Sequence, residues 1–255
     1  MRFVVSCLGL LALCCVAAPP GPRGPLRGAG IEGAFDMSLA LNSAQAVRED
    51  GTTVSGSSDH YSSDFAVVPR RLELRLSPID WMDIGGDIGW LDGGLDFRLG
   101  VPDYPSRVFA GNVAIGIRSG QPGFFRDTQP ARSTWARLEA YPLVGAPDQR
   151  LLLSIGAHTG TFYHELGGAG VFGDWATQVM RREVRIEGGF GFFTARYAGS
   201  LLLALEPYVV VDSGAALASG CPGCDTVRYH QDWGCVLVLR LALAWRAPWA
   251  KSKQP

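Results

Sequence analysis

The sequence predicts an all-β fold, and three observations lead to that prediction. Apolar and polar residues alternate with a period of two in one segment after another beyond Gly30, as in strands that bury one face. No stretch carries the 3.6-residue spacing of an amphipathic helix. Glycine contributes 33 and proline 16 of the 255 residues, which argues against helix bundles and coiled coils.

The alternation is regular along the whole chain. In residues 70–77, RRLELRLS, each leucine is followed by a charged or polar residue, and residues 235–245, CVLVLRLALAW, place leucines on one face. Because the spacing is two, the apolar and charged residues of each segment lie on opposite faces of a strand. The segments with this pattern are residues 32–41, 70–77, 83–91, 95–99, 108–118, 133–142, 151–159, 183–193, 201–212 and 235–245.

The connections between these segments are sorted by length. Long connections at residues 42–65, 119–132, 160–181 and 213–232 alternate with short ones such as 78–80, 144–150 and 194–200. Such sorting is typical of a transmembrane antiparallel up-and-down β-barrel, with tight turns at one rim and long loops at the other. A hairpin at residues 92–94 keeps the long loops on one side and gives ten strands. Residues 95–99 are short for a membrane crossing, so eight strands is the alternative.

Aromatic residues near the strand ends fit the two interfacial girdles of such a barrel. The residues expected there are Trp90, Trp135 and Trp233 at the loop side and Trp81, Tyr141 and Trp245 at the turn side.

The sequence predicts four consecutive parts of the chain. Residues 1–18 have a positive start, an apolar run and small residues at the end, which predicts a secretory signal peptide. Cleavage after Ala17 or Ala18 and lipidation at Cys14 or Cys15 both remain open. Residues 19–30 form a Pro/Gly-rich linker that offers nothing to a core, residues 31–246 form the barrel, and residues 247–255 form a C-terminal tail.

The chain resembles the small outer-membrane β-barrel proteins, including the OmpW-like and OmpX-like barrels. The resemblance lies in its leader, in its sorted loops and in alternating strands such as FDMSLAL, RRLELRLS and CVLVLRLALAW. The cysteine-containing leader and Arg-rich composition are also similar to spirochaetal outer-membrane proteins. Two features depart from the group: RAPWAKSKQP follows Trp245 where such barrels end on an aromatic residue, and the expected lumen is charged where that of OmpW-like barrels is apolar.

The resemblance implies an outer-membrane location in a diderm bacterium, with membrane lipid and the barrel-assembly machinery as partners. The expected function is that of a surface protein, or a narrow pore for small solutes, with a solute or host ligand as a further partner. The alternative is a secreted or periplasmic lipocalin-like barrel that binds a small apolar ligand. Nucleic acid is excluded as a partner, because the net charge is −1 and the arginines are scattered singly.

Charged residues on the polar faces are the candidate functional residues. Eight to ten strands leave an interior that side chains nearly fill, so paired arginines and carboxylates predict either a structural plug or a narrow polar pore. The predicted lumen residues are Arg71, Glu73, Arg75, Asp83, Asp87, Asp96, Arg98, Arg118, Arg137, Glu139, Glu183, Arg185, Glu187, Glu206 and Arg240.

Other chemistry is sparse. Cys221 and Cys224 have the C-x2-C spacing of a metal knuckle, but an exported location favours a loop disulfide, with Cys235 left to face lipid. Neither a metal nor a cofactor is expected. Because His158 and His164 belong to no recognisable catalytic pattern, we expect no enzymatic activity.

Overall fold

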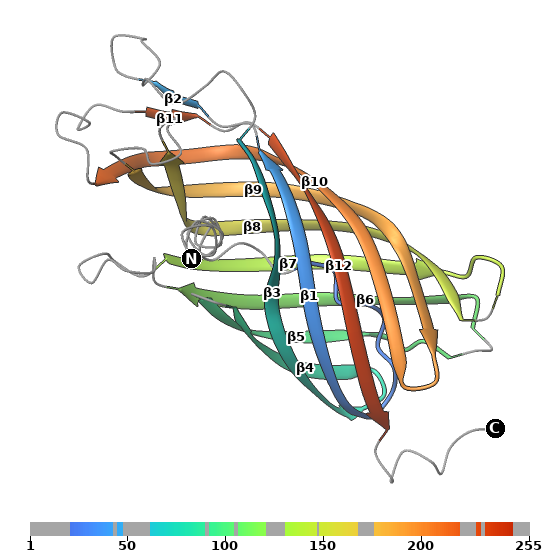
Figure 1. Ribbon diagram of the computed structural model, residues 1–255. Coiled ribbons are helices and arrows are strands. Elements are labelled where there is room, and N and C mark those ends of the chain that lie inside the picture. Colours follow the sequence, from blue (N-terminus) through green and yellow to red (C-terminus); the bar gives the residue numbers. More distant parts are fainter. Residues whose placement is uncertain are drawn as a thin grey trace, which may run out of the picture.

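The chain is described here by a computed structural model, in which a closed ten-stranded antiparallel barrel dominates (Figure 1). The structure describes residues 21–42, 45–47, 62–89, 92–104, 107–120, 131–146, 148–167, 176–219, 228–230 and 233–246. Within these residues, no helix is long and apolar enough to span a membrane. The barrel strands are β1 (Gly30–Asn42), β3 (Ser62–Ile79), β4 (Met82–Gly89), β5 (Asp92–Val101), β6 (Phe109–Gly120), β7 (Ala131–Pro142), β8 (Gln149–Gly167), β9 (Ala176–Arg196), β10 (Gly199–Ser219) and β12 (Trp233–Arg246).

Each strand pairs with its neighbour in sequence, and β1 closes the barrel against β12 in register from Gly30↔Arg246 to Asn42↔Gly234. The first and last strands therefore lie side by side (Figure 1). We call the rim where β1 begins and β12 ends the terminal end, and the opposite rim the loop end. The predicted ten strands are confirmed.

Two details of the predicted strands are wrong. The hairpin between β4 and β5 does not turn at residues 92–94: Gly93 and Gly94 pair with Ile88 and Asp87 inside the ladder. As a result β5 has 10 residues, and the short strand that suggested an eight-stranded barrel disappears.

The other detail concerns strand length. Strands β8, β9 and β10 have 19, 21 and 21 residues, so they extend well into the predicted loops at 160–181 and 213–232. Two short strands, β2 (Gln45–Val47) and β11 (Arg228–His230), also lie within predicted long loops and form a separate two-stranded sheet.

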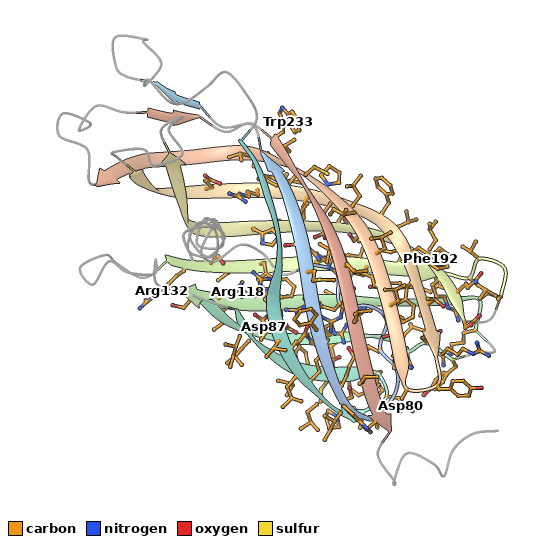
Figure 2. All side chains as sticks on the ribbon, viewed as in Figure 1. Asp80, Asp87, Arg118, Arg132, Phe192 and Trp233 are labelled. Carbon is orange, nitrogen blue, oxygen red and sulfur yellow. The ribbon has the colours of Figure 1, made fainter. Side chains whose placement is uncertain are left out.

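Apolar side chains face outward and charged ones face inward, which is the reverse of a lipocalin-like barrel. The outer surface exposes large apolar residues on every barrel strand for which side chains are described (Figure 2), among them Leu72, Leu74, Ile84, Leu95, Ile115, Leu138, Leu153, Phe190, Leu203 and Leu241. Some apolar residues do point inward, and Tyr141, Leu152, Phe193, Leu202 and Val238 belong to a buried cluster inside the barrel.

The expected aromatic girdles are only partly present. Trp233 at the loop end and Trp81 and Trp245 at the terminal end are exposed, as Figure 2 shows for Trp233. Trp135 and Tyr141 are buried instead, because they share the inward face of β7 with Arg137 and Glu139. Trp135 packs over Gly116, where a Cβ atom would lie 2.6 Å from the indole ring. Trp90 lies outside the described residues.

Close approach of β9 to β10 depends on a glycine. A Cβ atom on Gly191 would lie 2.2 Å from the carbonyl oxygen of Leu203, and backbone cannot move away as a flexible side chain can. Gly191→Ala is therefore expected to lower the free energy of unfolding by about 1–3 kcal/mol, the usual cost of overpacking, measured by urea unfolding of the detergent-solubilised protein. Gly188→Ala in the same strand is the control, since a Cβ atom there would lie 3.9 Å from the carbonyl oxygen of Ser154, an ordinary contact distance; equal losses would contradict the steric explanation.

Candidate functional site in the lumen

The lumen of the barrel collects the charged residues that the sequence singles out. All fifteen are buried, and each has no more than 6% of its surface exposed. The barrel is the reason, since successive side chains of a strand alternate between its inside and its outside. A mixed set of charges at this burial must be paired to be tolerated.

The densest pairing lies on the inner faces of β3, β4 and β5. Arg75 donates to Asp83 at 2.6 and 3.1 Å and also contacts Glu73 and Asp96. Arg98 donates to Asp83 from the other side, with its Nε 2.9 and 3.0 Å from the two carboxylate oxygens. A Cβ atom on Gly85 would lie 2.5 Å from the Arg75 guanidinium. This glycine therefore lets the Arg75 side chain lie flat against β4.

Arginines on neighbouring strands extend this network around the wall. Arg118 of β6 contacts Asp87 at 2.8 and 3.0 Å, and Arg71 Nε lies 3.9 Å from the same carboxylate. Across the β1–β12 seam, Arg240 donates to Asp36 at 3.0 Å. The Arg240 guanidinium also reaches Glu32 at 3.1 Å and Glu73 at 2.5 Å.

A second network lies on β7, β8, β9 and β10. Arg137 contacts Glu187, with Nε at 2.8 Å, and lies 3.0 Å from Glu206. His158 Nε2 is 2.7 Å from the second oxygen of Glu187. The sequence alone assigns His158 no role, because the neighbours of a single histidine become apparent only when β8 and β9 are placed in register. Beside this group, Arg185 donates to Glu183 at 2.8 Å and stacks over the Tyr208 ring at 4.8 Å.

The N-terminal segment, residues 21–29, also lies in the lumen, which the prediction of a linker without core contacts did not foresee. Leu26 is 1% and Arg23 is 3% exposed. The carbonyl oxygen of Gly24 accepts hydrogen bonds from Arg98 at 2.7 Å and Asn112 at 3.3 Å. Arg23 reaches carboxylates on three strands: its Nη1 contacts Glu73, and its Nη2 lies 2.9 Å from both Asp87 and Asp96.

Glycines let the N-terminal segment fit against the wall. Gly24 has a φ of 83°, a left-handed conformation that favours glycine, and a Cβ atom there would lie 3.2 Å from the Phe193 ring. A Cβ atom on Gly21 would lie 2.9 Å from a Val238 methyl group. Sequence composition marks the segment as non-helical, but it carries no periodicity that could reveal these contacts.

Polar contacts at the terminal end anchor the segment where it joins β1. Ala29 N donates to Asp80 at 2.8 Å, and Asp103 N donates to the carbonyl oxygen of Leu26 at 2.7 Å. Arg27 donates to the carbonyl oxygens of Tyr197 and Ala198 at 2.8 and 3.0 Å.

The Asp103 side chain extends this anchor to β8. Its carboxylate accepts from Arg150 at 2.6 Å. Burial raises the pKa of the Asp103 carboxyl, although the neighbouring Arg150 guanidinium acts in the opposite direction. The turns of the terminal end and the segment are thereby tied together.

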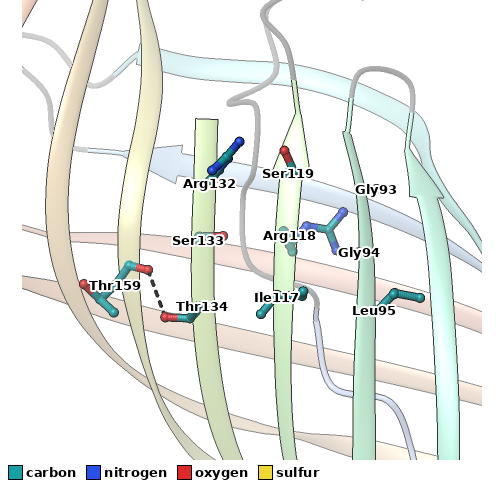
Figure 3. Close-up of a pocket in the computed structure, with 10 residues that line it drawn as sticks. All are labelled: Gly93, Gly94, Leu95, Ile117, Arg118, Ser119, Arg132, Ser133, Thr134 and Thr159. Atoms are coloured by element: carbon teal, nitrogen blue, oxygen red, sulfur yellow. Dashed lines mark hydrogen bonds between the residues drawn. The ribbon is translucent and has the colours of Figure 1, made fainter. Parts of the chain in front are cut away.

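A pocket of about 630 Å3 lies toward the loop end, where β5, β6, β7 and β8 are adjacent (Figure 3). Its lining includes lumen-facing Arg118 and Ser133 together with Ile117, Thr134 and Thr159, whose side chains belong to the outward face. Thr134 Oγ1 donates to the carbonyl oxygen of Thr159 at 3.5 Å. With Arg132 and Ser119, these hydroxyl groups mark a polar margin above the apolar outer surface.

Of the three cysteines considered in the sequence, the structure describes Cys235. Cys221 and Cys224 lie outside the described residues. Cys235 is a free, half-buried cysteine on the outward face of β12. No group of three or more His, Cys, Asp or Glu residues in the described ranges is arranged to hold a metal ion.

Comparisons with known proteins show similarity of fold. No protein-family model and no curated protein matches the chain. Among solved structures, the chain is similar to Neisserial surface protein A, with a TM-score of 0.35 and 9% identity over 88% of this chain and 100% of that one. It is also similar to the outer membrane protease OmpT from Escherichia coli, with a TM-score of 0.45 and 7% identity over 88% of this chain and 99% of that one. Neither match assigns the chain to the OmpW-like or OmpX-like group.

Proposed function

We propose that this protein is an outer-membrane surface barrel whose lumen is held closed by ion pairs, so that its loop end carries the function. The observation that carries the proposal is the burial of all fifteen lumen charges within a wall whose outer face is apolar. An apolar exterior suits lipid, and a charged interior of this width is filled by its own side chains. Membrane lipid and the barrel-assembly machinery are then its partners during insertion.

The polar margin at the loop end supports the proposed orientation in the membrane. Thr134 and Thr159 face outward on β7 and β8, and Arg132 lies further toward the loop end. Below them the same faces carry apolar residues such as Leu138 and Ile155. This change from apolar to polar is where the hydrocarbon layer would end, with the long connections beyond it.

Planar-bilayer recording tests the closed lumen. The purified, unmodified protein is expected to show no steady ion conductance, because the arginines and carboxylates occupy the space through which ions would pass. Heat-modifiable migration in detergent confirms that the sample recorded is a folded barrel. Steady conductance would contradict the closed lumen and favour a narrow pore for small solutes.

Surface labelling tests the location and the orientation together. Single cysteines placed at loop-end positions in a background lacking native cysteines are expected to react with a membrane-impermeant maleimide in intact cells. Cysteines in the turn at residues 80–81 should react only after the cells are broken. Labelling of both sets in intact cells, or release of the protein into the periplasmic fraction, would favour a secreted or periplasmic barrel instead.

A further inference from the structure

The N-terminal segment places a charged side chain in the lumen, although the segment itself belongs to no strand of the barrel wall. Residues 21–29 form no strand pairs, and Arg23 meets Glu73, Asp87 and Asp96 at sequence separations of 50, 64 and 73 residues. Its side chain is 1% exposed. These contacts therefore do not depend on the backbone pairing that holds the other lumen arginines in place.

Among the ion-paired residues that the structure describes around Arg23, the wall has one positive charge fewer than negative charges when Arg23 is left out. Ion pairs between described residues connect Arg23 to a network whose wall carboxylates are Glu32, Asp36, Glu73, Asp83, Asp87 and Asp96 and whose wall guanidinium groups are Arg71, Arg75, Arg98, Arg118 and Arg240. Six carboxylates thus face five guanidinium groups. Arg23 is the sixth cation, and because unpaired buried charges are costly, the wall favours a cation at this place.

The arrangement of the three carboxylates suits a planar, forked cation. One end of the Arg23 fork contacts Glu73, and the other is shared between Asp87 and Asp96 at 2.9 Å each. A guanidinium group presents several donors in one plane, whereas an ammonium group is a compact point charge. Carboxylates on three adjacent strands are therefore bridged at once by a guanidinium group.

We propose that Glu73, Asp87 and Asp96 form a guanidinium-binding site in the lumen, that Arg23 occupies it as a tethered ligand, and that residues 21–29 are a displaceable stopper. The proposal rests on the closed lumen proposed above. When the stopper is out, the site binds small guanidinium compounds, and the uncovered carboxylates make the lumen passable to cations.

Planar-bilayer recording of Arg23→Ala tests the site. The variant is expected to conduct cations in preference to anions, and methylguanidinium should block it at a concentration about ten times lower than methylammonium, as one additional charge-assisted hydrogen bond implies. Arg107→Ala is the matched control: Arg107 is exposed at the terminal end, where its guanidinium group lies 5.0 Å from the centroid of the Tyr104 ring, and this variant should remain silent. Arg23→Lys should conduct less than Arg23→Ala, because it restores the charge without the fork.

The outcomes separate this proposal from the closed lumen itself. A folded but silent Arg23→Ala, or equal block by the two cations, overturns the guanidinium site while leaving the closed lumen in place. Steady conductance of the unmodified protein overturns the closed lumen first. If Arg23→Ala does not fold, refolding with each cation, scored by heat-modifiable migration, replaces the recording. The site then requires rescue by methylguanidinium, and equal rescue by both cations or rescue by neither overturns it.

Discussion

Replacing Leu241 with arginine is expected to prevent assembly of the barrel in the outer membrane. Leu241 lies in the middle of β12, opposite Phe35 and Leu201 on the neighbouring strands, and it is 46% exposed on the outer face. A charge at such a position near the bilayer midplane costs about 2–4 kcal/mol. The measurement is the amount of heat-modifiable protein in the outer-membrane fraction, and Leu239→Arg should behave in the same way.

Controls separate the effect of lipid from that of an added charge. Thr134→Arg introduces the same side chain at the polar margin next to Arg132 and should assemble normally. Val238→Arg should be milder than Leu241→Arg, because Val238 faces inward. The structure adds that Val238 packs against Gly21, so an arginine there should displace the N-terminal segment while the barrel still forms. Normal assembly of Leu241→Arg would contradict the lipid-facing orientation.

Replacing Glu73 with glutamine is expected to lower the free energy of unfolding by about 3–5 kcal/mol, the usual loss when one partner of a buried ion pair is removed. The Glu73 side chain is completely buried and contacts Arg23, Arg75 and Arg240. Glutamine keeps the volume but leaves these three guanidinium groups with one charge fewer to balance them. Urea unfolding measures the loss; guanidinium chloride is unsuitable because it could occupy the proposed site.

Glu32→Gln is the matched control for this charge removal. The Glu32 side chain is 12% exposed, and Arg240 contacts it at 3.1 Å near the terminal end. Because solvent screens this pair and Arg240 keeps two other carboxylates, we expect a loss of about 1 kcal/mol or less. Equal losses for the two variants would show that the position of Glu73 between three arginines has no special importance for stability.

The face on which most residues lie could be predicted because the period of a strand is two. Once one residue of a strand, such as Arg75, is assigned to the inside, Leu74 and Leu76 must face outward, and the face of every other residue in that strand follows. The same reasoning placed Glu206 and Arg240 inside, although their strands are apolar on both faces or nearly so. The alternation of long and short connections then predicted the number of strands, since each strand carries the chain from one rim of the barrel to the other.

Other features were predicted wrongly or could not be predicted. Trp135 and Tyr141 were assigned to girdles from residue type, but their position relative to Arg137 already required the inward face. The long extensions of β8, β9 and β10 contain residues such as those at 160–167, where one-sided alternation fades. Contacts of residues 21–29 could not be predicted, because they depend on carboxylates from several strands that only barrel closure brings together.

The charged seam between β1 and β12 has a consequence for the order in which the barrel assembles. Arg240 contacts Glu73, Asp36 and Glu32 at sequence separations of 167, 204 and 208 residues. Until the last strand arrives, a nascent sheet holds these carboxylates without that cation. A slip of two residues at closure would keep the apolar pattern intact yet move Arg240 away from Asp36. We therefore expect the ion pairs of Arg240 to favour the native register of β12 when the barrel closes. The apolar pattern alone does not distinguish this register from one shifted by two residues.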